Sequence, residues 1–183
     1  MYTDPLDVIW LDAARRMGMT VVRSPDVFAA WDGQGTLTIG TAETLDPDDS
    51  LAQMILHETC HALIEGADAF DKPDWGVHLD QPGQRVREHA CLRLQAALTG
   101  PFGLRRFFAS TTSFRRYYDN LPEDPLADMS DPATADARAG HQRACSGPWS
   151  SVLSLALLRT RTIAECVAGA AATDSLWATY ERQ

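Results

Sequence analysis

The stretch MILHETCHALIEG, residues 54–66, decides how the rest of the chain is interpreted. Two histidines, His57 and His61, lie four residues apart in it, and Glu58 directly follows the first. Residues at this spacing lie one turn apart on the same face of an α-helix, so both imidazoles would point the same way. The opposite face carries apolar residues. The stretch therefore predicts a helix with one face toward the core and one face that carries two histidines.

The residues around this stretch predict where the helix begins and ends. Asp46 is a good N-cap, Pro47 suits the first helical position, and the two acids that follow complement the positive end of the helix dipole. Gly66 suits the position that ends a helix. We therefore expect a helix over residues 47–65.

The two histidines and the glutamate have the spacing of an HExxH metal site. Zinc prefers tetrahedral ligands, with nitrogen at about 2.0–2.1 Å, and the two imidazoles can provide two of them without strain. Glu58 would lie to one side, too far round the helix to be a ligand but placed to act as a general base on water. The pattern predicts one zinc ion per chain, held by His57 and His61. The alternative is a surface helix with coincidental histidines.

A catalytic zinc site needs a third protein ligand and an open position. Glu88 lies near the start of the next predicted helix, from which a carboxylate can reach back to the metal. His89 lies about 100° further round that helix, and His78 lies in the preceding loop, so both remain alternatives. Ile64 and Ala67 stand where the metzincin motif has glycine and histidine, which excludes that class.

The remaining sequence predicts an α+β fold, mainly helical, with a small antiparallel sheet beside the HExxH helix. Length allows one domain over residues 1–183 with a full core. Its parts would be an N-terminal helix and sheet (1–46), metal-site helices (47–101) and a helical C-terminal part (102–183). The other expected elements are a helix over 4–18, two or three antiparallel strands between 20 and 40 with a hairpin at 32–35, helices over 83–100 and 103–118, a connector over 119–135 and two or three further helices.

A strand (TLTIG), the motif HETCH and a helix reading EHACLRLQAAL before Pro101 resemble the ImmA/IrrE-type zinc metallopeptidases over residues 36–101. In that family HExxH is followed by a helix of pattern E-x-x-A-x-x-F-A-x-x-L-L-x-P. Glu88 matches the family's third ligand, which implies a gluzincin-like site on a zincin-like fold. The chain departs from the pattern at Thr59 and Cys60, which replace Leu-Gly, and at Gln95, which replaces a small apolar residue.

The resemblance implies a zinc-dependent peptidase in which Glu58 takes a proton from water and passes it to the leaving amine. The strand at 36–40 would line the cleft and pair with an extended peptide. One alternative is a non-catalytic metal-binding or interaction protein on the same scaffold, which would have no use for Glu58. Another is a metal-dependent hydrolase of a non-peptide amide. Candidates for binding substrate or an oxyanion are His78, Tyr117, Tyr118 and His141.

Three further residues each have two interpretations. Cys60 and Cys91 follow His57 and Glu88 by three residues, so they would pack together as small apolar residues or act as a redox pair or disulfide. Trp75 would fill the core beneath the site or form a wall of a specificity pocket.

Charge and hydropathy limit the choice of partners. The net charge of −9 argues against nucleic-acid binding. No apolar run is long enough for a membrane span, and the first residues do not have the pattern of a signal peptide, so we expect a cytoplasmic protein. The resemblance to peptidases implies a peptide or protein as the substrate. Seven arginines between Pro82 and Tyr118 precede six acids in 119–136. The two segments would partly neutralise each other, or the arginines would attract an acidic substrate. The sequence carries no indication of oligomeric state.

Overall fold

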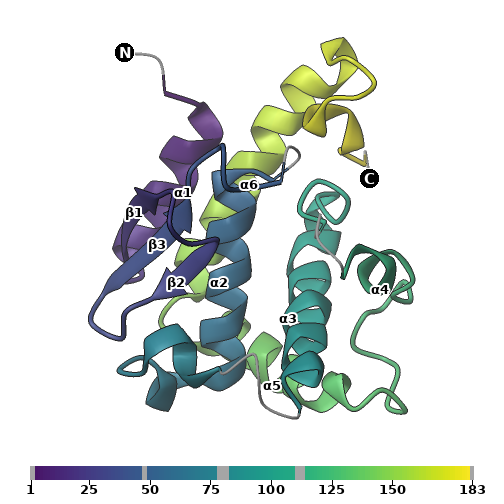
Figure 1. Ribbon diagram of the computed structural model, residues 1–183. Coiled ribbons are helices and arrows are strands. Elements are labelled where there is room, and N and C mark those ends of the chain that lie inside the picture. The colour runs from purple at the N-terminus through teal and green to yellow at the C-terminus, as the bar shows by residue number, and fades with distance from the viewer. Residues whose placement is uncertain (1–2, 47–48, 78–82, 110–113, 182–183) are drawn as a thin grey trace.

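Helix α2 (Leu51–Glu65), which carries the HExxH motif, lies in the middle of the structure (Figure 1). The structure is a computed structural model that describes residues 3–46, 49–77, 83–109 and 114–181. The other helices and the strands are α1 (Pro5–Arg16), α3 (Gln84–Thr99), α4 (Arg115–Asp119), α5 (Ala133–Ser146), α6 (Ser150–Val167), β1 (Thr20–Ser24), β2 (Ala29–Trp31) and β3 (Thr36–Gly40). This is an α+β fold, as expected, and its helices far outweigh its small sheet.

Helix α2 begins later than predicted. Its N-cap is Ser50, whose hydroxyl accepts a hydrogen bond from the backbone N–H of Gln53 at 3.1 Å. Asp46, the expected cap, instead forms a turn with Asp49, whose N–H donates to the Asp46 carbonyl. The prediction of a start at residue 47 was therefore wrong, because a hydroxyl closer to the helix satisfies the free N–H group. The end at Gly66 is confirmed, with φ at 82°.

Helix α2 is buried on nearly every side. Thirteen of its fifteen residues are buried, and only His57 and Glu65 are partly exposed. Helices α1, α3 and α5 all pack against it. The face that carries the two histidines is therefore covered as well, chiefly by α3.

The sheet is mixed rather than antiparallel. Its order is β1-β3-β2, with β3 parallel to β1 and antiparallel to β2. The predicted hairpin at 32–35 joins β2 to β3, and the Asp32 carboxylate accepts hydrogen bonds from the N–H groups of Gln34 and Thr36. The antiparallel prediction fails because the chain passes from β1 to the far edge of the sheet before β3 fills the centre. Both edges of β3 are therefore paired, so the predicted pairing of a peptide with strand 36–40 was wrong.

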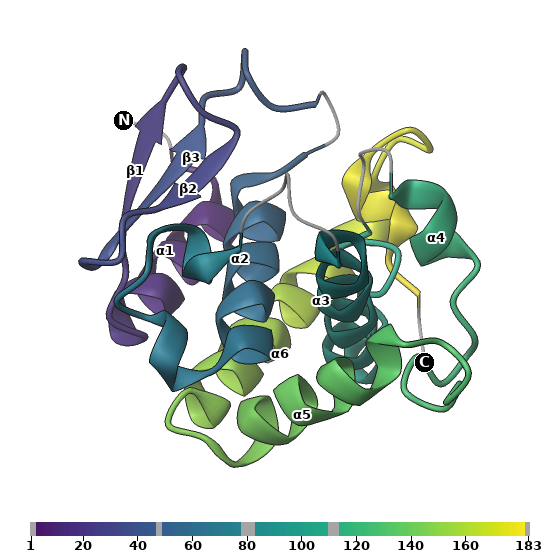
Figure 2. The same ribbon diagram turned by 60° about the horizontal axis from the view of Figure 1, so that its bottom comes forward.

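Helix α5 holds the two helices of the site together. It runs across α2 and α3 on one side of the molecule (Figure 2). Gly140 allows the close approach, because a Cβ there would lie 2.8 Å from Ile64 and 2.9 Å from Leu94. The Arg143 guanidinium donates to the carbonyls of Leu63 and Ile64 at the end of α2. A positive charge at this end is favourable because the helix dipole is negative there.

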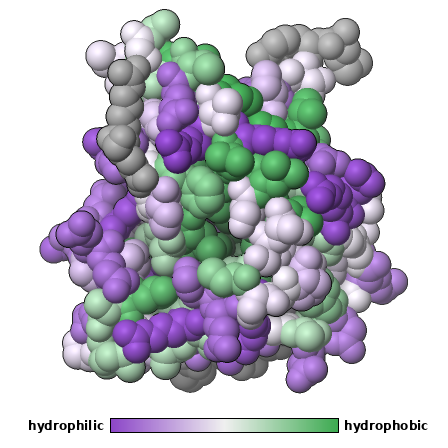
Figure 3. Space-filling view, turned by 180° about the vertical axis from the view of Figure 1, so that it is seen from behind, coloured by the Kyte–Doolittle hydropathy of each residue, from purple (hydrophilic) through white to green (hydrophobic). Residues whose placement is uncertain are grey.

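Residues 103–118 differ from the prediction, and helix α6 completes the fold. The expected helix over 103–118 was wrong: within the described residues of this range only α4 is an α-helix, since Gly103 has φ at 68° and Phe107 and Phe108 are both buried. Helix α6 packs on α1, and the face opposite to that of Figure 1 shows apolar surface at its centre with hydrophilic borders (Figure 3). Among the described residues, no helix is long and apolar enough to cross a membrane.

Candidate metal centre

The packing of α3 against α2 brings His57, His61 and Glu88 together. The Nε2 atoms of the two histidines lie 3.2 Å apart. Glu88 Oε1 lies 3.2 Å from His61 Nε2, and Oε2 lies 3.7 Å from His57 Nε2. Ligand atoms around a tetrahedral zinc ion, with bonds of about 2.0–2.1 Å, are separated by roughly 3.3 Å. The three side chains therefore have the spacing that a zinc ion requires.

The charges at this cluster also suit a cation. Burial lowers the pKa of His61, but the hydrogen bond and charge of Glu88 outweigh it and raise the pKa to about 9. Burial raises the pKa of Glu88, whereas the hydrogen bond and charge of His61 lower it to about 2. Both shifts favour an ionised carboxylate at Glu88 with a proton on His61. A divalent cation would take the place of that proton, since a ligand histidine must be neutral.

Gln95 fixes the proton position on His57. The Gln95 side-chain N–H₂ donates to the Phe108 carbonyl, which leaves its oxygen facing His57 Nδ1 at 3.1 Å. Because an amide oxygen only accepts, His57 carries its proton on Nδ1 and presents the free lone pair of Nε2 to the cluster. His61 has no such support, since its Nδ1 is buried without a partner among the described residues.

Glu58 has a hydrogen-bond partner that does not belong to the three clustered side chains. The Trp75 indole N–H donates to Glu58 Oε2 at 3.1 Å, and Trp75 itself stacks on Trp31 with centroids 4.3 Å apart. Trp75 is buried, so it does fill the core beneath the site as expected. Its direct bond to Glu58 was not predicted, and nothing in the sequence signals it.

The loop that carries Trp75 is strained. Asp74 and Trp75 both have positive φ, at 48° and 57°, a conformation that costs an ordinary residue about 1 kcal/mol or more. The Asp74 carboxylate accepts from the Trp31 backbone N–H at 3.0 Å, which helps to hold the loop on β2. The strain is therefore offset by contacts that place the indole against Glu58.

Cys91 is a second candidate for a metal ligand. Its sulfur, with a nitrogen from each of His57 and His61, forms a group whose ligand atoms lie within 4.8 Å of one another. However, the thiol lies 3.5 Å from His57 Nδ1 and donates to the His57 carbonyl, behind the imidazole rather than beside Nε2. Burial, and next a hydrogen bond with Cys60, raise the pKa of Cys91, which disfavours the thiolate that a metal needs. Both features favour Glu88 over Cys91 as the candidate third ligand. Both cysteines are buried and free, so they form no disulfide here.

Of the residues predicted to bind substrate or an oxyanion, the three that the structure describes do not join this cluster. The Tyr117 hydroxyl donates to Asp131 and accepts from Arg93, and burial raises its pKa to about 12. The Tyr118 hydroxyl, which is buried, donates to the Arg105 carbonyl. His78 lies outside the described residues. His89, an alternative third ligand, stacks on Tyr117 with centroids 3.6 Å apart.

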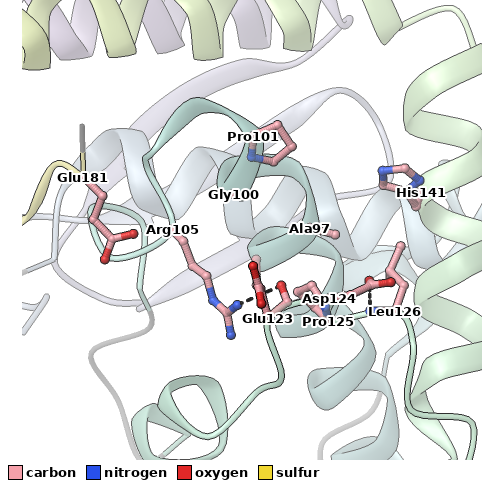
Figure 4. A pocket seen from close by; sticks show the side chains of 11 residues that line it. Ala97, Gly100, Pro101, Arg105, Glu123, Asp124, Pro125, Leu126, His141 and Glu181 are labelled. Carbon is pink, nitrogen blue, oxygen red and sulfur yellow. Dashed lines mark hydrogen bonds between the residues drawn. The ribbon is translucent and has the colours of Figure 1, made fainter. Parts of the chain in front are cut away.

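His141 lies elsewhere, on α5. It lines a pocket of about 530 Å³ whose floor includes Ala97, Gly100 and Pro101 at the end of α3 (Figure 4). Arg105 reaches across from the other side and donates to the backbone carbonyls of residues 121–123. None of the clustered residues His57, His61 and Glu88 lines this pocket, whose charged lining residues are Arg105 and three acids, Glu123, Asp124 and Glu181.

Comparison with known proteins gives no family to which this chain can be assigned. No protein-family model, no curated protein and no solved structure matches it.

Proposed function

We propose that this chain is a zinc-dependent peptidase, with the metal held by His57, His61 and Glu88. The main support is the convergence of three ligand atoms at 3.2, 3.2 and 3.7 Å on a partly open site. Side-chain exposure falls from 20% at His57 through 14% at Glu88 to 7% at His61, so the site opens toward His57. A substrate would approach from that side.

Zinc, when bound, supplies Lewis acidity that polarises a carbonyl and lowers the pKa of a water molecule. Glu58 would accept a proton from water on Oε1, since Oε2 is engaged by Trp75, and the oxygen of that water would form the new bond to the scissile carbonyl carbon. The same carboxyl then donates the proton to the leaving amine as the peptide bond breaks. Gln95 keeps His57 in the tautomer that leaves Nε2 free. Glu58 and His57 both lie on α2, and each is oriented by a hydrogen bond from another part of the fold, Glu58 by Trp75 and His57 by Gln95.

A non-catalytic metal-binding protein is the second candidate function. Such a protein would need only the three ligands, His57, His61 and Glu88. These ligands therefore do not distinguish a non-catalytic metal-binding protein from a peptidase. Glu58 favours catalysis, because a buried carboxylate held beside the ligands by a strained loop has no role in a structural site. Hydrolysis of a non-peptide amide would use the same groups.

The test is cleavage of a peptide library by the zinc-loaded protein and by the Glu58→Gln variant. We expect cleavage by the wild type, its loss on removal of zinc by a chelator, and its loss in Glu58→Gln with zinc still bound. Cleavage of simple amides but of no peptide would favour the third function. Equal activity of Glu58→Gln and wild type would contradict the assigned general base.

A further inference from the structure

Most arginines in the basic segment between residues 82 and 118 are already neutralised or engaged. Arg87 pairs with Glu65, Arg93 with Asp131, and Arg115 with Asp119. Arg106 lies 4.0 Å from Glu181, and Arg105 donates to three backbone carbonyls. Mutual neutralisation with the acidic segment 119–136 therefore holds for Arg93 and Arg115, whereas Arg87 and Arg106 pair with acids elsewhere and Arg105 bonds backbone carbonyls.

The other two, Arg85 and Arg116, have no acidic partner among the described residues, and both are exposed. They line one pocket of about 380 Å³ between α3 and α4. We call it the α3–α4 pocket; its lining is Arg85, His89, Phe114, Arg116, Tyr117 and Asn120. No carboxylate lines it, although the chain as a whole has a net charge of −9.

The aromatic wall of this pocket is fixed in place. His89 stacks on Tyr117, and Phe114 meets the His89 ring edge to face at 5.9 Å. Tyr117 is anchored from behind by hydrogen bonds to Arg93 and Asp131. Because Arg93 is 2% exposed, this support lies in the interior and does not compete for a ligand.

The polar groups of the pocket lack a partner of opposite charge. His89 Nε2 is buried with no hydrogen-bond partner among the described residues. The two acids whose charges act on His89 are already engaged, Glu88 by the histidines and Asp131 by Arg93. Two guanidinium groups, each with a planar set of donors, therefore face a site in which only an added anion would balance their charge.

We propose that the α3–α4 pocket binds an oxyanion, a carboxylate or a phosphate, between Arg85 and Arg116 and against the His89–Tyr117 stack. This site is distinct from the histidine cluster, and its occupancy does not depend on peptidase activity. A carboxylate would come from an acidic side chain of a bound peptide, and a phosphate from a small free ligand. The shared chemistry is a planar or tetrahedral group of anionic oxygens that accepts paired N–H donors.

The test is a titration of the isotope-labelled full chain, followed by NMR through the ring signals of His89 and Tyr117. The probes are inorganic phosphate, a short peptide with one glutamate, and the same peptide with glutamine. We expect saturable shifts with phosphate or the glutamate peptide at a Kd of about 1 mM, and none with the glutamine peptide. The anion that binds identifies the source.

Variants separate a built site from general charge attraction. Arg85→Ala/Arg116→Ala is expected to weaken binding about tenfold or more, since both charged hydrogen-bond donors are lost. Arg15→Ala/Arg161→Ala removes two arginines from α1 and α6 as a matched control, and should change the Kd less than about twofold. Lysine at both pocket positions keeps the charge but loses the paired donors, so it should bind with intermediate affinity.

Two results would overturn the proposal. One is the absence of saturable shifts from every probe at concentrations well above the expected Kd. The other is an equal loss of binding in the control double variant, which would mean that phosphate or peptide responds to net charge alone. Neither result bears on zinc binding or on peptide cleavage, so failure here and failure of the proposed function are distinguishable.

Discussion

Trp75 contacts both the candidate general base, Glu58, and the sheet residue Trp31. Its indole donates to Glu58 while its ring stacks on Trp31, so one side chain joins the general base to the sheet. Two consecutive residues with positive φ hold it there. A backbone outlier of this kind persists only where surrounding contacts enforce it, and such outliers gather at functional sites.

We predict that Trp75→Phe lowers kcat about tenfold and leaves the zinc content unchanged. Phenylalanine keeps an aromatic ring on Trp31 but cannot donate to Glu58, and a hydrogen bond to a charged group contributes about 1.5–3 kcal/mol. The measurement is kcat and KM with a peptide substrate, beside zinc content. Trp149→Phe is the matched control, because Trp149 packs on Phe70 and does not touch Glu58. Equal loss of kcat in both variants would point to general destabilisation instead.

Gln95 gives the second prediction at this scale. Gln95→Leu should weaken zinc binding about 10- to 100-fold, since the orienting partner of a ligand histidine is lost. The control is Gln53→Leu, which removes a similar buried amide bond, from Gln53 to the Ala109 carbonyl, but touches neither histidine. Zinc affinity from competition with a chelator is the measurement. An unchanged affinity in Gln95→Leu would mean that the amide does not orient His57.

At the scale of elements, the connector between α4 and α5 is tied down by one buried charge. The Arg93 guanidinium, 3% exposed, donates to Asp131 at 2.9 Å and to the Pro125 carbonyl. Asp131 also accepts from the Ala133 N–H at the start of α5. Arg93 thus attaches the connector between α4 and α5 to α3. The same guanidinium bonds the Tyr117 hydroxyl, which lines the α3–α4 pocket.

This attachment predicts a dependence of stability on acid. Burial raises the pKa of Asp131, but hydrogen bonds from Ala133, Arg93 and Tyr117 outweigh it, so the pKa is lowered from its usual value of 3.8. A carboxyl whose pKa is lower in the folded state contributes stability above its unfolded pKa, and loses it as pH falls through the folded pKa. Asp131→Asn should therefore destabilise the protein by about 1 kcal/mol at neutral pH, since solvent screens this partly exposed carboxylate, and the difference should shrink as pH falls below about 4.

The measurement for this prediction is urea unfolding of both proteins between neutral and acid pH. Asp128 also lies 3.8 Å from Arg93, so Asp128→Asn serves as a control, with a smaller effect because its side chain is 46% exposed. A constant difference between wild type and Asp131→Asn across the whole pH range would contradict the proposed ion pair.

Some elements could be predicted from the sequence and others could not, for identifiable reasons. Helices α1, α2 and α3 follow from apolar periodicity and from Gly66 at the end of α2. The start of α2 was misplaced because Asp46 and Ser50 are both good caps, and only the turn between residues 46 and 49 decides between them. The order of the strands depends on a crossover, which alternation of side chains does not encode.

For the whole molecule, the sequence predicted that His57, His61 and Glu88 come together, but it did not predict their surroundings. The spacing of His57 and His61 requires one helical turn, and the Glu88 position follows from a packed second helix. Gln95 departs from the family pattern in the sequence, and this departure was the only signal of its bond to His57. Trp75 and Cys91 approach the site through tertiary packing, which local pattern does not specify.

Metal content tests the central claim most directly. Zinc would be measured by elemental mass spectrometry on the wild type and on His57→Ala, Glu88→Ala, Cys91→Ala and Glu58→Gln variants, with folding checked by circular dichroism. The account predicts one zinc ion per chain in the wild type, its loss in His57→Ala and Glu88→Ala, and its retention in Cys91→Ala and Glu58→Gln. Full retention in Glu88→Ala with loss in Cys91→Ala would assign the third ligand to the thiol. A wild type that takes up no zinc even on reconstitution would contradict the metal site and the peptidase with it.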